Sequence, residues 1–540
     1  MIRPAVSLRN DGALPLRMLD REPMPQDSTT PGLEDPAASG SAPSLAKQVA
    51  KGAVWMVAVR FTSRTLGLVS TLALARILLP ADFGLVAMAT AFSQSVSSFS
   101  EVGLIAALVR HPEDAEDLYD TAFTMQMLRG LLTGGVVALA VPFAGRWFGD
   151  PRLQPILLVL AALAVASGFE NVAIAEFRRQ LRFDVEFPLR ILPRVLQVAA
   201  AIVAALLLRS YWALLIAMAV SQLARLAATY AVRPYRPRLT LRRWRDLFGF
   251  SFWTWAASVV RVAWDRSDAF IIAPALGATA FGLYSLATEI GGLPVSELLA
   301  PAMGVLFPGF AEAHRRGDAQ ALSPMAVVGF LTLLMAPLAI AISAAAGPVV
   351  VVLLGPRWLA ARSLVAVFAS VCAVAPIVSV SGALLTASGH MVRYFVASAI
   401  SAAMRVAMLL YAVRGGDLLV VAWWSVASAV FETLAFTVAL RITGELRLRD
   451  ELRGLLRTLL ASLVCLAALW ASGLGWRVAA PTGTLAAFLD GARTGLFAIA
   501  VFAAAVAALW RLAGKPYGPE ERFISMLRPL LSRLRHWPEA

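Results

Sequence analysis

The chain has 540 residues, of which 59% are hydrophobic and only 15% are charged, and its mean hydropathy is +0.72. Soluble domains carry roughly 25% charged residues, so this composition excludes a soluble globular protein. The net charge is +14, but the sequence shows no basic clusters interleaved with aromatic residues on a polar background, and a nucleic-acid partner is therefore not expected.

The first 44 residues are rich in Pro, Ser, Asp and Gly and lack an apolar segment of signal-peptide type. A secretory signal peptide needs such a segment, so this stretch does not match one. Low hydrophobicity of this kind is typical of disordered regions. We expect residues 1–44 to form a disordered cytoplasmic tail.

Two long apolar runs follow within residues 51–110, joined by the turn LLPADFG. Each can cross a bilayer, which takes about 20 apolar residues. Yet Arg60 and Arg64 lie inside the first run and Glu101 lies inside the second. Charges at membrane depth usually face a watery cavity or a partner, and residues four apart share a helix face. We expect both arginines to line a cavity, and Glu101 is a candidate for the same cavity.

Apolar runs continue along the chain and predict about fourteen membrane spans. The inner connections hold roughly twice as many arginines as the outer ones when both termini are placed in the cytoplasm. Every connection is short, which leaves no large outer domain for an enzyme acting on the outer face. The expected spans are 52–76, 83–109, 119–143, 154–176, 187–208, 211–232, 247–273, 281–306, 324–347, 362–386, 391–413, 418–440, 455–475 and 494–513, the ninth with an extension to residue 354.

The two halves of this pattern resemble each other. Residues 83–90 and 281–288 read FGLVAMAT and FGLYSLAT, with five of eight residues identical at a separation of 198. Without a gap, Trp55 falls on Trp253. Chance similarity between apolar helices is the alternative, but Trp and the FGL turn are not generic membrane residues. The repeat therefore favours two homologous helix bundles.

The most basic connection, RPYRPRLTLRRWRD, lies at the join between the repeats. We interpret it as a linker on anionic headgroups, with a docking site for a cytoplasmic partner as the alternative. The C-terminal tail is also basic, and its residues 519–536 are either an amphipathic helix on the inner leaflet or disordered. The segments are the tail (1–44), an N-terminal six-helix bundle (45–232), the linker (233–246), a C-terminal six-helix bundle (247–441), two additional spans (442–513) and a basic cytoplasmic tail (514–540).

Span seven concentrates charge. Arg261, Asp265 and Asp268 share one helix face, and the first two are spaced to form an ion pair. Span seven corresponds to span one in the repeat, so both are expected to line the same cavity. Glu289 in span eight is a further candidate. The remaining intramembrane charges are interpreted as structural pairs: Arg129, Glu170, Arg194, Arg225, Arg405 and Glu432.

The chemistry of these side chains favours binding over catalysis. Guanidinium groups suit phosphates and carboxylates, and a diphosphate matches two stacked arginines. Nearby carboxylates could hold protons or sodium ions, or balance the arginines when the site is empty. Cys372 and Cys465 lie in apolar runs and are read as core residues. The sequence has no metal-ligand spacing and no phosphate-binding loop of the GxxxxGK[ST] type, so we predict no catalytic residue, no metal and no cofactor.

Several motifs resemble a known family. They are ARxLxPxDFG at 75–84, GLxAALV at 103–109, FRRQLRF at 177–183, DAFIIAPALGATAFGLYSLAT at 268–288, VLFPGFAE at 305–312, LLGPRWLAA at 353–361 and ALLTASGH at 383–390. Together they resemble, over about residues 45–440, the Wzx-type oligosaccharide flippases, polysaccharide transporters of the MOP (multidrug/oligosaccharidyl-lipid/polysaccharide) exporter superfamily. One departure is Pro274, which is expected to kink span seven at its outer end.

The resemblance implies an all-α integral membrane protein with two pseudo-symmetric six-helix bundles in a V and two extra C-terminal helices. It also implies a flippase of the bacterial cytoplasmic (inner) membrane that moves undecaprenyl-diphosphate-linked oligosaccharides by alternating access. Its partners would be the lipid-linked oligosaccharide, membrane lipids and other glycan assembly proteins. On this reading Arg60, Arg64 and Arg261 bind the diphosphate, and the other candidates line the sugar path or take part in H+ or Na+ coupling: Glu101, Asp265, Asp268 and Glu289.

Three alternatives remain open. The nearest is a related exporter of another cargo, such as the peptidoglycan lipid precursor or a drug. The second is a membrane polymerase or ligase for glycans, against which the short outer connections argue. The third is a structural scaffold in a glycan assembly complex, which would not need arginines at mid-membrane depth.

Overall fold

The computed structural model describes residues 45–100, 108, 116–180, 182–244, 252–316, 323–443, 448–476, 483–515 and 520–521. The expected tail at 1–44 and Glu101 lie outside these residues, as does most of the expected tail beyond residue 515. The chain divides into units of residues 1–48 and 49–540, and the described helices belong to the second unit, apart from the start of the first helix. The regular elements are all helical among the described residues, which confirms the all-α prediction.

The N-terminal group of helices is built from two packed pairs. Helix α4 packs on α5 and α7 packs on α8, while α5 also contacts α2 and α8. The motif LLPADFG creates the start of α2, because Pro80 needs no hydrogen-bond acceptor there and Asp82 accepts a hydrogen bond from the Leu79 N–H at 3.0 Å. The elements are α1 (Leu45–Ile77), α2 (Pro80–Phe99), α4 (Glu116–Phe148), α5 (Leu153–Gly168), η1 (Val172–Ile174), α6 (Ala175–Arg179), α7 (Phe183–Leu208) and α8 (Trp212–Val232).

The C-terminal group is organised around its longest helix, α10. Expected span seven and the first part of span eight are joined in this one element, which is broken at Gly277 with φ 83°. The rest of span eight lies in the two elements that follow it. The break lies three residues beyond Pro274, because the left-handed backbone needs a glycine. The elements are α10 (Phe252–Gly291), η2 (Val295–Leu299), α11 (Ala300–Arg315), α12 (Pro324–Ala344), α13 (Ala346–Leu353), η3 (Pro356–Ala361), α14 (Arg362–Ala369), α15 (Val371–Ala387), α16 (Met391–Ala412), η4 (Val413–Gly415) and α17 (Leu418–Ile442).

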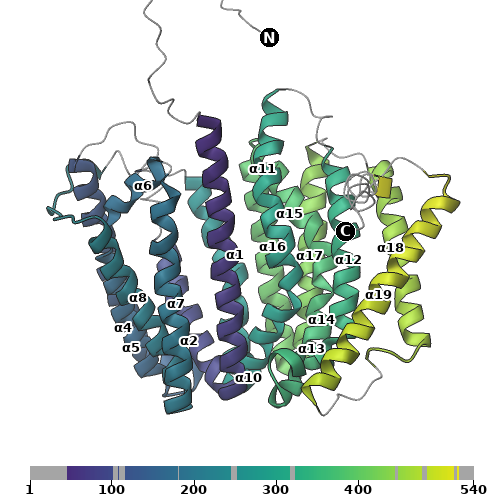
Figure 1. Cartoon of the computed structure of the whole chain (residues 1–540), viewed down its shortest axis with the longest axis horizontal. Helices are drawn as coiled ribbons and strands as arrows, with labels where there is room; N and C mark the ends of the chain where they lie inside the picture. Colours follow the sequence, from purple (N-terminus) through teal and green to yellow (C-terminus); the bar gives the residue numbers. More distant parts are fainter. Residues whose placement is uncertain are drawn as a thin grey trace, which may run out of the picture. The chain divides into compact units, whose positions relative to one another are not determined.

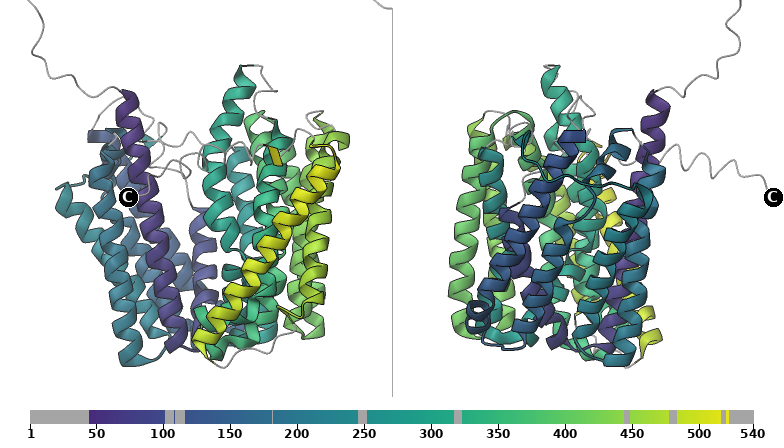
Figure 2. Two further views of the ribbon diagram at one scale, coloured as in Figure 1. Left: turned by 45° about the vertical axis from the view of Figure 1, so that its right-hand side comes forward. Right: turned by 90° about the vertical axis from the view of Figure 1, so that its left-hand side faces the viewer.

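Two further helices, α18 (Leu448–Ala471) and α19 (Thr484–Leu512), pack on each other and against α12 and α13. Figure 2 shows α19, in yellow, running obliquely across the C-terminal group. A separate apolar core that includes Leu333, Cys465 and Phe502 holds them there.

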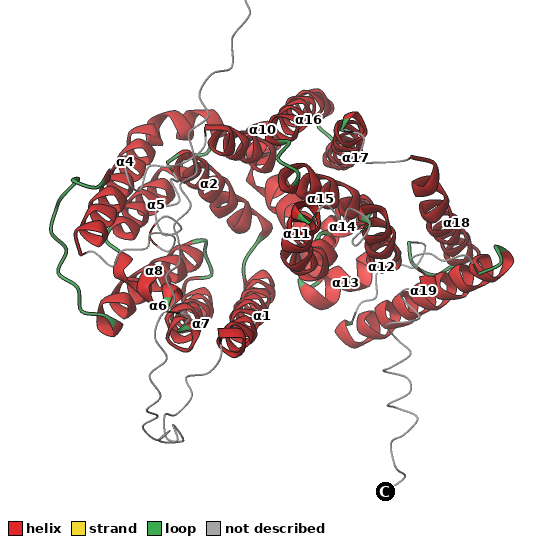
Figure 3. Ribbon diagram, turned by 90° about the horizontal axis from the view of Figure 1, so that it is seen from above, coloured by secondary structure: helices red, strands yellow, loops and turns green. Residues whose placement is uncertain are grey.

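The two groups meet along α2 and α10, which make the most extensive contact between any two of the described helices. The largest core cluster crosses this boundary and joins Leu85 and Met88 of α2 to Ile272 and Tyr284 of α10. Helix α1 lies between the N-terminal helices and the C-terminal group in Figures 1 and 3. A side chain on α1 can therefore reach residues of both groups.

Fewer of the described helices meet the length and hydropathy expected of a membrane span than the fourteen spans that the sequence predicts. Among the described residues, eight helices are long and apolar enough to cross a membrane, or nine if the bent pair 356–369 and 371–387 is one span. Each expected span contains helix over its described residues, but several are divided between two or more elements, and the count of fourteen is not confirmed. Helix α5 has only 16 residues, and α10 continues from expected span seven into the first part of span eight.

The basic linker is docked on the N-terminal group over the part that the structure describes. Asp120 at the start of α4 accepts hydrogen bonds from the Tyr235 hydroxyl and, at 3.1 Å, from the Arg238 N–H. Arg233 pairs with Glu176 and donates to the Ala173 carbonyl at 2.8 Å. The linker therefore follows a fixed path, while three of its arginines stay exposed: Arg236, Arg238 and Arg242.

Candidate functional site

Arg64, one of the two arginines predicted on α1, connects the two helix groups. Its Nε donates to Glu297 Oε1 in a short ion pair, and its Nη2 donates to Ser296 Oγ at 3.1 Å. The Ser296 hydroxyl also donates to Glu297 Oε1 at 2.9 Å. Both acceptor residues lie in η2, a single π-helical turn, a structure that is frequent at functional sites. Arg64 therefore links α1 to η2, the turn that precedes α11.

Arg194 on α7 extends the positive charge beside Arg64. Its Nη2 lies so close to α1 that a Cβ built on Gly67 would be only 2.6 Å away. Its Nη1 donates to Gln197 Oε1 at 2.7 Å, and no carboxylate among the described residues forms an ion pair with it. The charges of Arg64 and Glu289 both act on its guanidinium. Within the described part of the chain, Arg194 is thus a cation without a dedicated counter-ion.

The other predicted members of this group are less constrained. Arg60 is exposed on α1 and forms no ion pair with the residues that the structure describes. Glu289 is also exposed, on the second half of α10. We use the name arginine cluster for Arg60, Arg64 and Arg194, with Glu289 and Glu297 as its carboxylates.

A cavity of about 480 Å³, with charged and apolar side chains in its wall, adjoins the arginine cluster inside the N-terminal group. Ser63 of α1 and Arg194 of α7 belong to its wall. Two of its three arginines are neutralised: Arg190 pairs with Glu186 at 2.7 Å, and Arg225 pairs with Glu170 at 2.8 Å. Among the described residues of the wall, the unpaired charge is that of Arg194, so the cavity offers an anion one uncompensated guanidinium.

A second group of charges, the C-terminal network, lies on α10, α16 and α17. Asp268 receives hydrogen bonds from Arg405 Nη2 at 2.7 and 2.9 Å, and Arg405 Nη1 donates to Ser428 Oγ at 2.8 Å. The Arg405 guanidinium also lies over the Trp264 ring, 4.7 Å from its centroid. This pair is nearly buried, with side-chain exposures of 11% and 16%, so it has a structural role in the present conformation.

Arg261 belongs to the C-terminal network. The ion pair with Asp265 expected from their spacing forms at 3.1 Å, and Arg261 also lies 3.6 Å from Glu432. Its described partners are all members of the network, so the structure does not bring it to the diphosphate candidates Arg60 and Arg64. The network contains three carboxylates and two guanidinium groups and carries one net negative charge when all are ionised.

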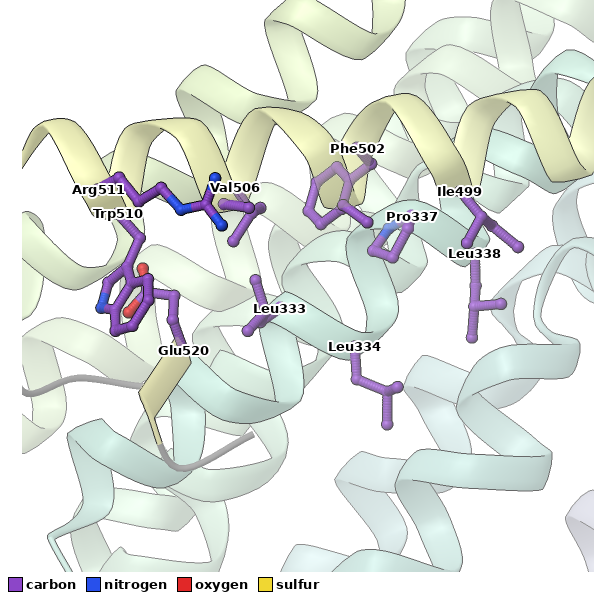
Figure 4. Close-up of a pocket in the computed structure, with 12 residues that line it drawn as sticks. Leu333, Leu334, Pro337, Leu338, Ile499, Phe502, Val506, Trp510, Arg511 and Glu520 are labelled. Atoms are coloured by element: carbon purple, nitrogen blue, oxygen red, sulfur yellow. The ribbon is translucent and has the colours of Figure 1, made fainter. Parts of the chain in front are cut away.

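An apolar pocket of about 380 Å³ lies between α12 and α19. Figure 4 shows Leu333, Leu338 and Phe502 around it, with Arg511 and Glu520 at one end. Glu520 is bound by Arg457 at 2.7 and 3.0 Å. The pocket is suited to hydrocarbon, and among its described lining residues only Arg511 adds an uncompensated charge.

Sequence reasoning misses two members of the site. The sequence predicts a structural pair for Arg194, yet this arginine has no acidic partner among the described residues. Glu297 is visible in the sequence only as a charge in span eight, yet it pairs with Arg64. The stretch GGLP at 291–294 could have revealed it, because two glycines and a proline inside an apolar helix indicate an irregular turn.

Part of the chain matches a known protein family. Residues 73–363 match the model of the family described as polysaccharide biosynthesis protein. The succinoglycan biosynthesis transport protein ExoT of Rhizobium meliloti is 29% identical over 58% of this chain and 64% of its own length. The lipopolysaccharide biosynthesis protein WzxC of Escherichia coli is 22% identical over 64% of this chain and 71% of its own length. The chain thus spans just under two thirds of the length of the first relative.

Two solved structures share the fold. The lipid II flippase MurJ in an inward closed conformation aligns with 85% of this chain and 99% of its own, with a TM-score of 0.67 and 13% identity. An inward-facing multidrug resistance transporter of the MATE family and the MOP superfamily aligns with 73% of this chain and 98% of its own, with a TM-score of 0.55 and 15% identity. The chain is therefore a multi-pass membrane protein with the fold of these transporters.

Proposed function

The chain belongs to the family of polysaccharide biosynthesis proteins, and from this premise we propose that it is a flippase for undecaprenyl-diphosphate-linked oligosaccharide repeat units. It would serve the synthesis of lipopolysaccharide, capsule or exopolysaccharide. The similarity to a succinoglycan transport protein and to a lipopolysaccharide biosynthesis protein supports this class of cargo. In this proposal the protein lies in the bacterial cytoplasmic membrane, and both chain termini lie on the cytoplasmic side.

The observation that carries the proposal is the arginine cluster on α1 and α7. Arg64 and Arg194 lie well inside helices of 33 and 26 residues, at positions where charge is costly unless it serves a ligand or a partner. Two guanidinium groups from two helices match the two phosphates of a diphosphate. A lipid carrier of this kind is the cargo whose charge the cluster fits best.

The mechanism follows from the polarity of the cargo. A glycan cannot cross hydrocarbon, because its hydroxyl groups would lose their hydrogen bonds to water. The protein supplies a polar path for the glycan, while the prenyl chain stays in lipid. The helix groups then rock about their contact, closing toward the cytoplasm and opening outward. Outward movement of an anion from an inside-negative cell is favourable by roughly 2.3 kcal/mol per charge per 100 mV.

Ion coupling is assigned to the C-terminal network. Its one net negative charge is partly enclosed by protein, and a proton or a sodium ion would neutralise it. Glu432 has the more buried side chain of the two carboxylates that share Arg261, with 12% exposure against 46% for Asp265. We therefore assign the coupling proton to Glu432. The protein is a secondary-type transporter in this proposal and catalyses no covalent step.

A deletion strain tests the function. Lipid-linked glycans are labelled by a membrane-impermeant periodate treatment of intact and lysed spheroplasts, which reports the face that they occupy. Loss of the protein should leave finished repeat units on the cytoplasmic face. Wild-type protein should restore export, and the Arg60→Ala/Arg64→Ala variant should not, although it accumulates normally. Arg414→Ala, which removes one exposed arginine in η4 directly after α16, is the control for loss of a positive charge elsewhere.

The contrary outcomes separate the alternatives. Repeat units that accumulate on the outer face would indicate that polymerisation or ligation is lost. This result would identify the protein as a membrane polymerase or ligase for glycans. Accumulation of the peptidoglycan lipid precursor instead would identify the other cargo. Full export by the Arg60→Ala/Arg64→Ala variant would remove the arginines from the mechanism and leave the transport class intact.

A further inference from the structure

Glu297 has a role in anion binding that the proposed function does not contain, and the packing of Arg194 against α1 shows how the second guanidinium of the site reaches the anion. Both residues lie close to this part of α1: Glu297 neutralises Arg64, and the Arg194 guanidinium packs against Gly67, three residues after Arg64. In this structure, a carboxylate of the chain itself therefore occupies hydrogen-bonding positions on Arg64 that a phosphate would use.

The ion pair between Arg64 and Glu297 is weak enough for a ligand anion to replace Glu297. Each side chain is 36% exposed, and ion pairs with this access to water contribute little to stability. A diphosphate offers more acceptor oxygens and more negative charge than one carboxylate. It can therefore replace Glu297 on Arg64 at a modest cost.

The π-helical turn gives Glu297 this position. Residues 295–299 form η2 between α10 and α11, directly after Gly291, Gly292 and Pro294. A proline cannot donate a backbone hydrogen bond to the carbonyl four residues before it, so Pro294 interrupts regular helical bonding between the end of α10 and η2. The turn belongs to the C-terminal group, and it places both Glu297 and Ser296 against Arg64 of α1.

Arg194 is placed to complete the anion site. Its guanidinium reaches α1 because Gly67 has no side chain in the way. Its one described hydrogen bond goes to a neutral amide, that of Gln197, so its charge remains available. Arg194 also lines the cavity of about 480 Å³ together with Ser63, one residue before Arg64. Gly67 lies three residues after Arg64 on the same face of α1, so the Arg194 guanidinium packs on the face of α1 that carries Arg64.

We propose that Glu297 is an internal competitor for the diphosphate on Arg64, and that Arg194 is a further ligand-binding residue of the same site. This inference rests on the proposed function, because it takes the cargo to be a diphosphate. When the diphosphate binds, Glu297 leaves Arg64, and the side-chain link between α1 and η2 is broken. Cargo binding itself then releases one contact between the two helix groups, which favours the change of access.

Binding of farnesyl diphosphate to the purified full-length chain tests the proposal by isothermal titration calorimetry. Glu297→Gln should bind the probe about five-fold more tightly, because the competing charge is gone. This gain should vanish in the Arg64→Ala background, because Glu297 acts through Arg64. Glu312→Gln is the control: it removes a carboxylate of α11 that pairs only with Arg315 and Arg316 among the described residues.

The role of Arg194 is tested in the same titration. Arg194→Ala should weaken binding about ten-fold. Arg194→Lys should recover part of the loss, because Lys keeps the positive charge but lacks the forked hydrogen-bond donors of the guanidinium. Gly67→Ala leaves every charge in place but displaces the guanidinium, so it should also weaken binding. Arg209→Gln, an equal loss of charge at the end of α7, should change nothing.

The outcomes separate the inference from the function. If wild-type protein binds the probe and Glu297→Gln binds equally or more weakly, Glu297 is not a competitor. If Arg194→Ala and Gly67→Ala both bind like wild type, Arg194 is outside the site. In these cases the proposed function still stands. If wild-type protein does not bind the diphosphate, the diphosphate cargo itself is wrong.

Discussion

Gly84 and Gly282 occupy corresponding positions of the two repeats and lie directly against each other where α2 crosses α10. A Cβ built on either glycine would lie 3.0 Å from the backbone nitrogen of the other. Each would also overlap a carbonyl oxygen of the opposite element, that of Ala278 or Pro80. The contact is therefore reciprocal, as expected for two related bundles that meet at their axis of pseudo-symmetry.

The first prediction concerns this crossing. Gly84→Ala and Gly282→Ala each add a methyl group where rigid backbone stands in the way, and overpacking of this kind costs typically about 1–3 kcal/mol. Both variants should melt at lower temperature than wild type in detergent, followed by fluorescence-detected size-exclusion chromatography. Gly135→Ala in α4, which has nothing within 4 Å of the added group, should melt unchanged or slightly higher. Equal melting of all three variants would contradict the close crossing.

The second prediction concerns Trp358, which is fully buried and joins the helix groups near the same crossing. Its Nε1 donates to the Ala75 carbonyl at 2.7 Å, and its ring packs edge-on against Phe83, with 5.4 Å between the ring centroids. Trp358→Phe removes the donor and part of the ring volume. We expect a loss of about 2 kcal/mol, from the unpaired carbonyl and the void together.

The measurement for Trp358→Phe is the same thermal unfolding experiment, and Trp423→Phe is its control. Trp423 is 56% exposed on α17, so its replacement removes an indole without disturbing the core. A lower melting temperature for Trp423→Phe than for Trp358→Phe would argue against a structural role for the buried indole.

These contacts mark the limit of what the sequence could predict. The repeat and the FGL turn indicated two related bundles, but not that Gly84 and Gly282 touch, because periodicity describes one helix at a time. The spacing of Arg261 and Asp265 predicted their ion pair, since both lie on one helix. The partner of Arg64 is 233 residues away, and such a pair depends on how the helix groups pack. For this reason the sequence shows that partner only as a charge in an apolar span.

The third prediction concerns the buried ion pair of Asp268 and Arg405. Asp268→Asn leaves the Arg405 guanidinium buried without its counter-ion, and breaking a buried pair from one side costs about 3–5 kcal/mol. The variant should be strongly destabilised in thermal unfolding. Asp265→Asn is the matched control, because its side chain is 46% exposed and its pair contributes little. The double variant Asp268→Asn/Arg405→Met should recover much of the lost stability, because no unpaired guanidinium remains buried. If it does not, the lost stability comes from Asp268 itself and not from the unpaired Arg405.

The fourth prediction concerns the linker and its pH dependence. Burial, together with the hydrogen bond to Asp120, raises the pKa of the Tyr235 hydroxyl above its usual value. A raised pKa means that the folded state holds the proton more tightly than the unfolded state. The stabilisation is complete below the unfolded pKa of about 10 and falls as the pH rises above it. Wild-type stability should decline above about pH 10.

Tyr235→Phe separates this effect from other alkaline damage. The variant lacks the hydroxyl, so it should be less stable near neutral pH by about 1 kcal/mol and should show a shallower decline above about pH 10. Thermal unfolding at a series of pH values measures both. Parallel curves for the two proteins would show that Tyr235 does not contribute to the alkaline transition.

The fifth prediction concerns ion coupling at Glu432. In proteoliposomes that contain a labelled lipid-linked glycan, an imposed pH gradient should accelerate translocation by wild-type protein if a proton exchanges with the C-terminal network. Glu432→Gln has no proton to exchange, so its rate should be the same with and without the gradient. Asp490→Asn removes a carboxylate of α19 that pairs with Arg493 at 3.2 Å and should respond like wild type. A Glu432→Gln variant that still responds to the gradient would place the coupling proton elsewhere, and a response to sodium alone would identify the other ion.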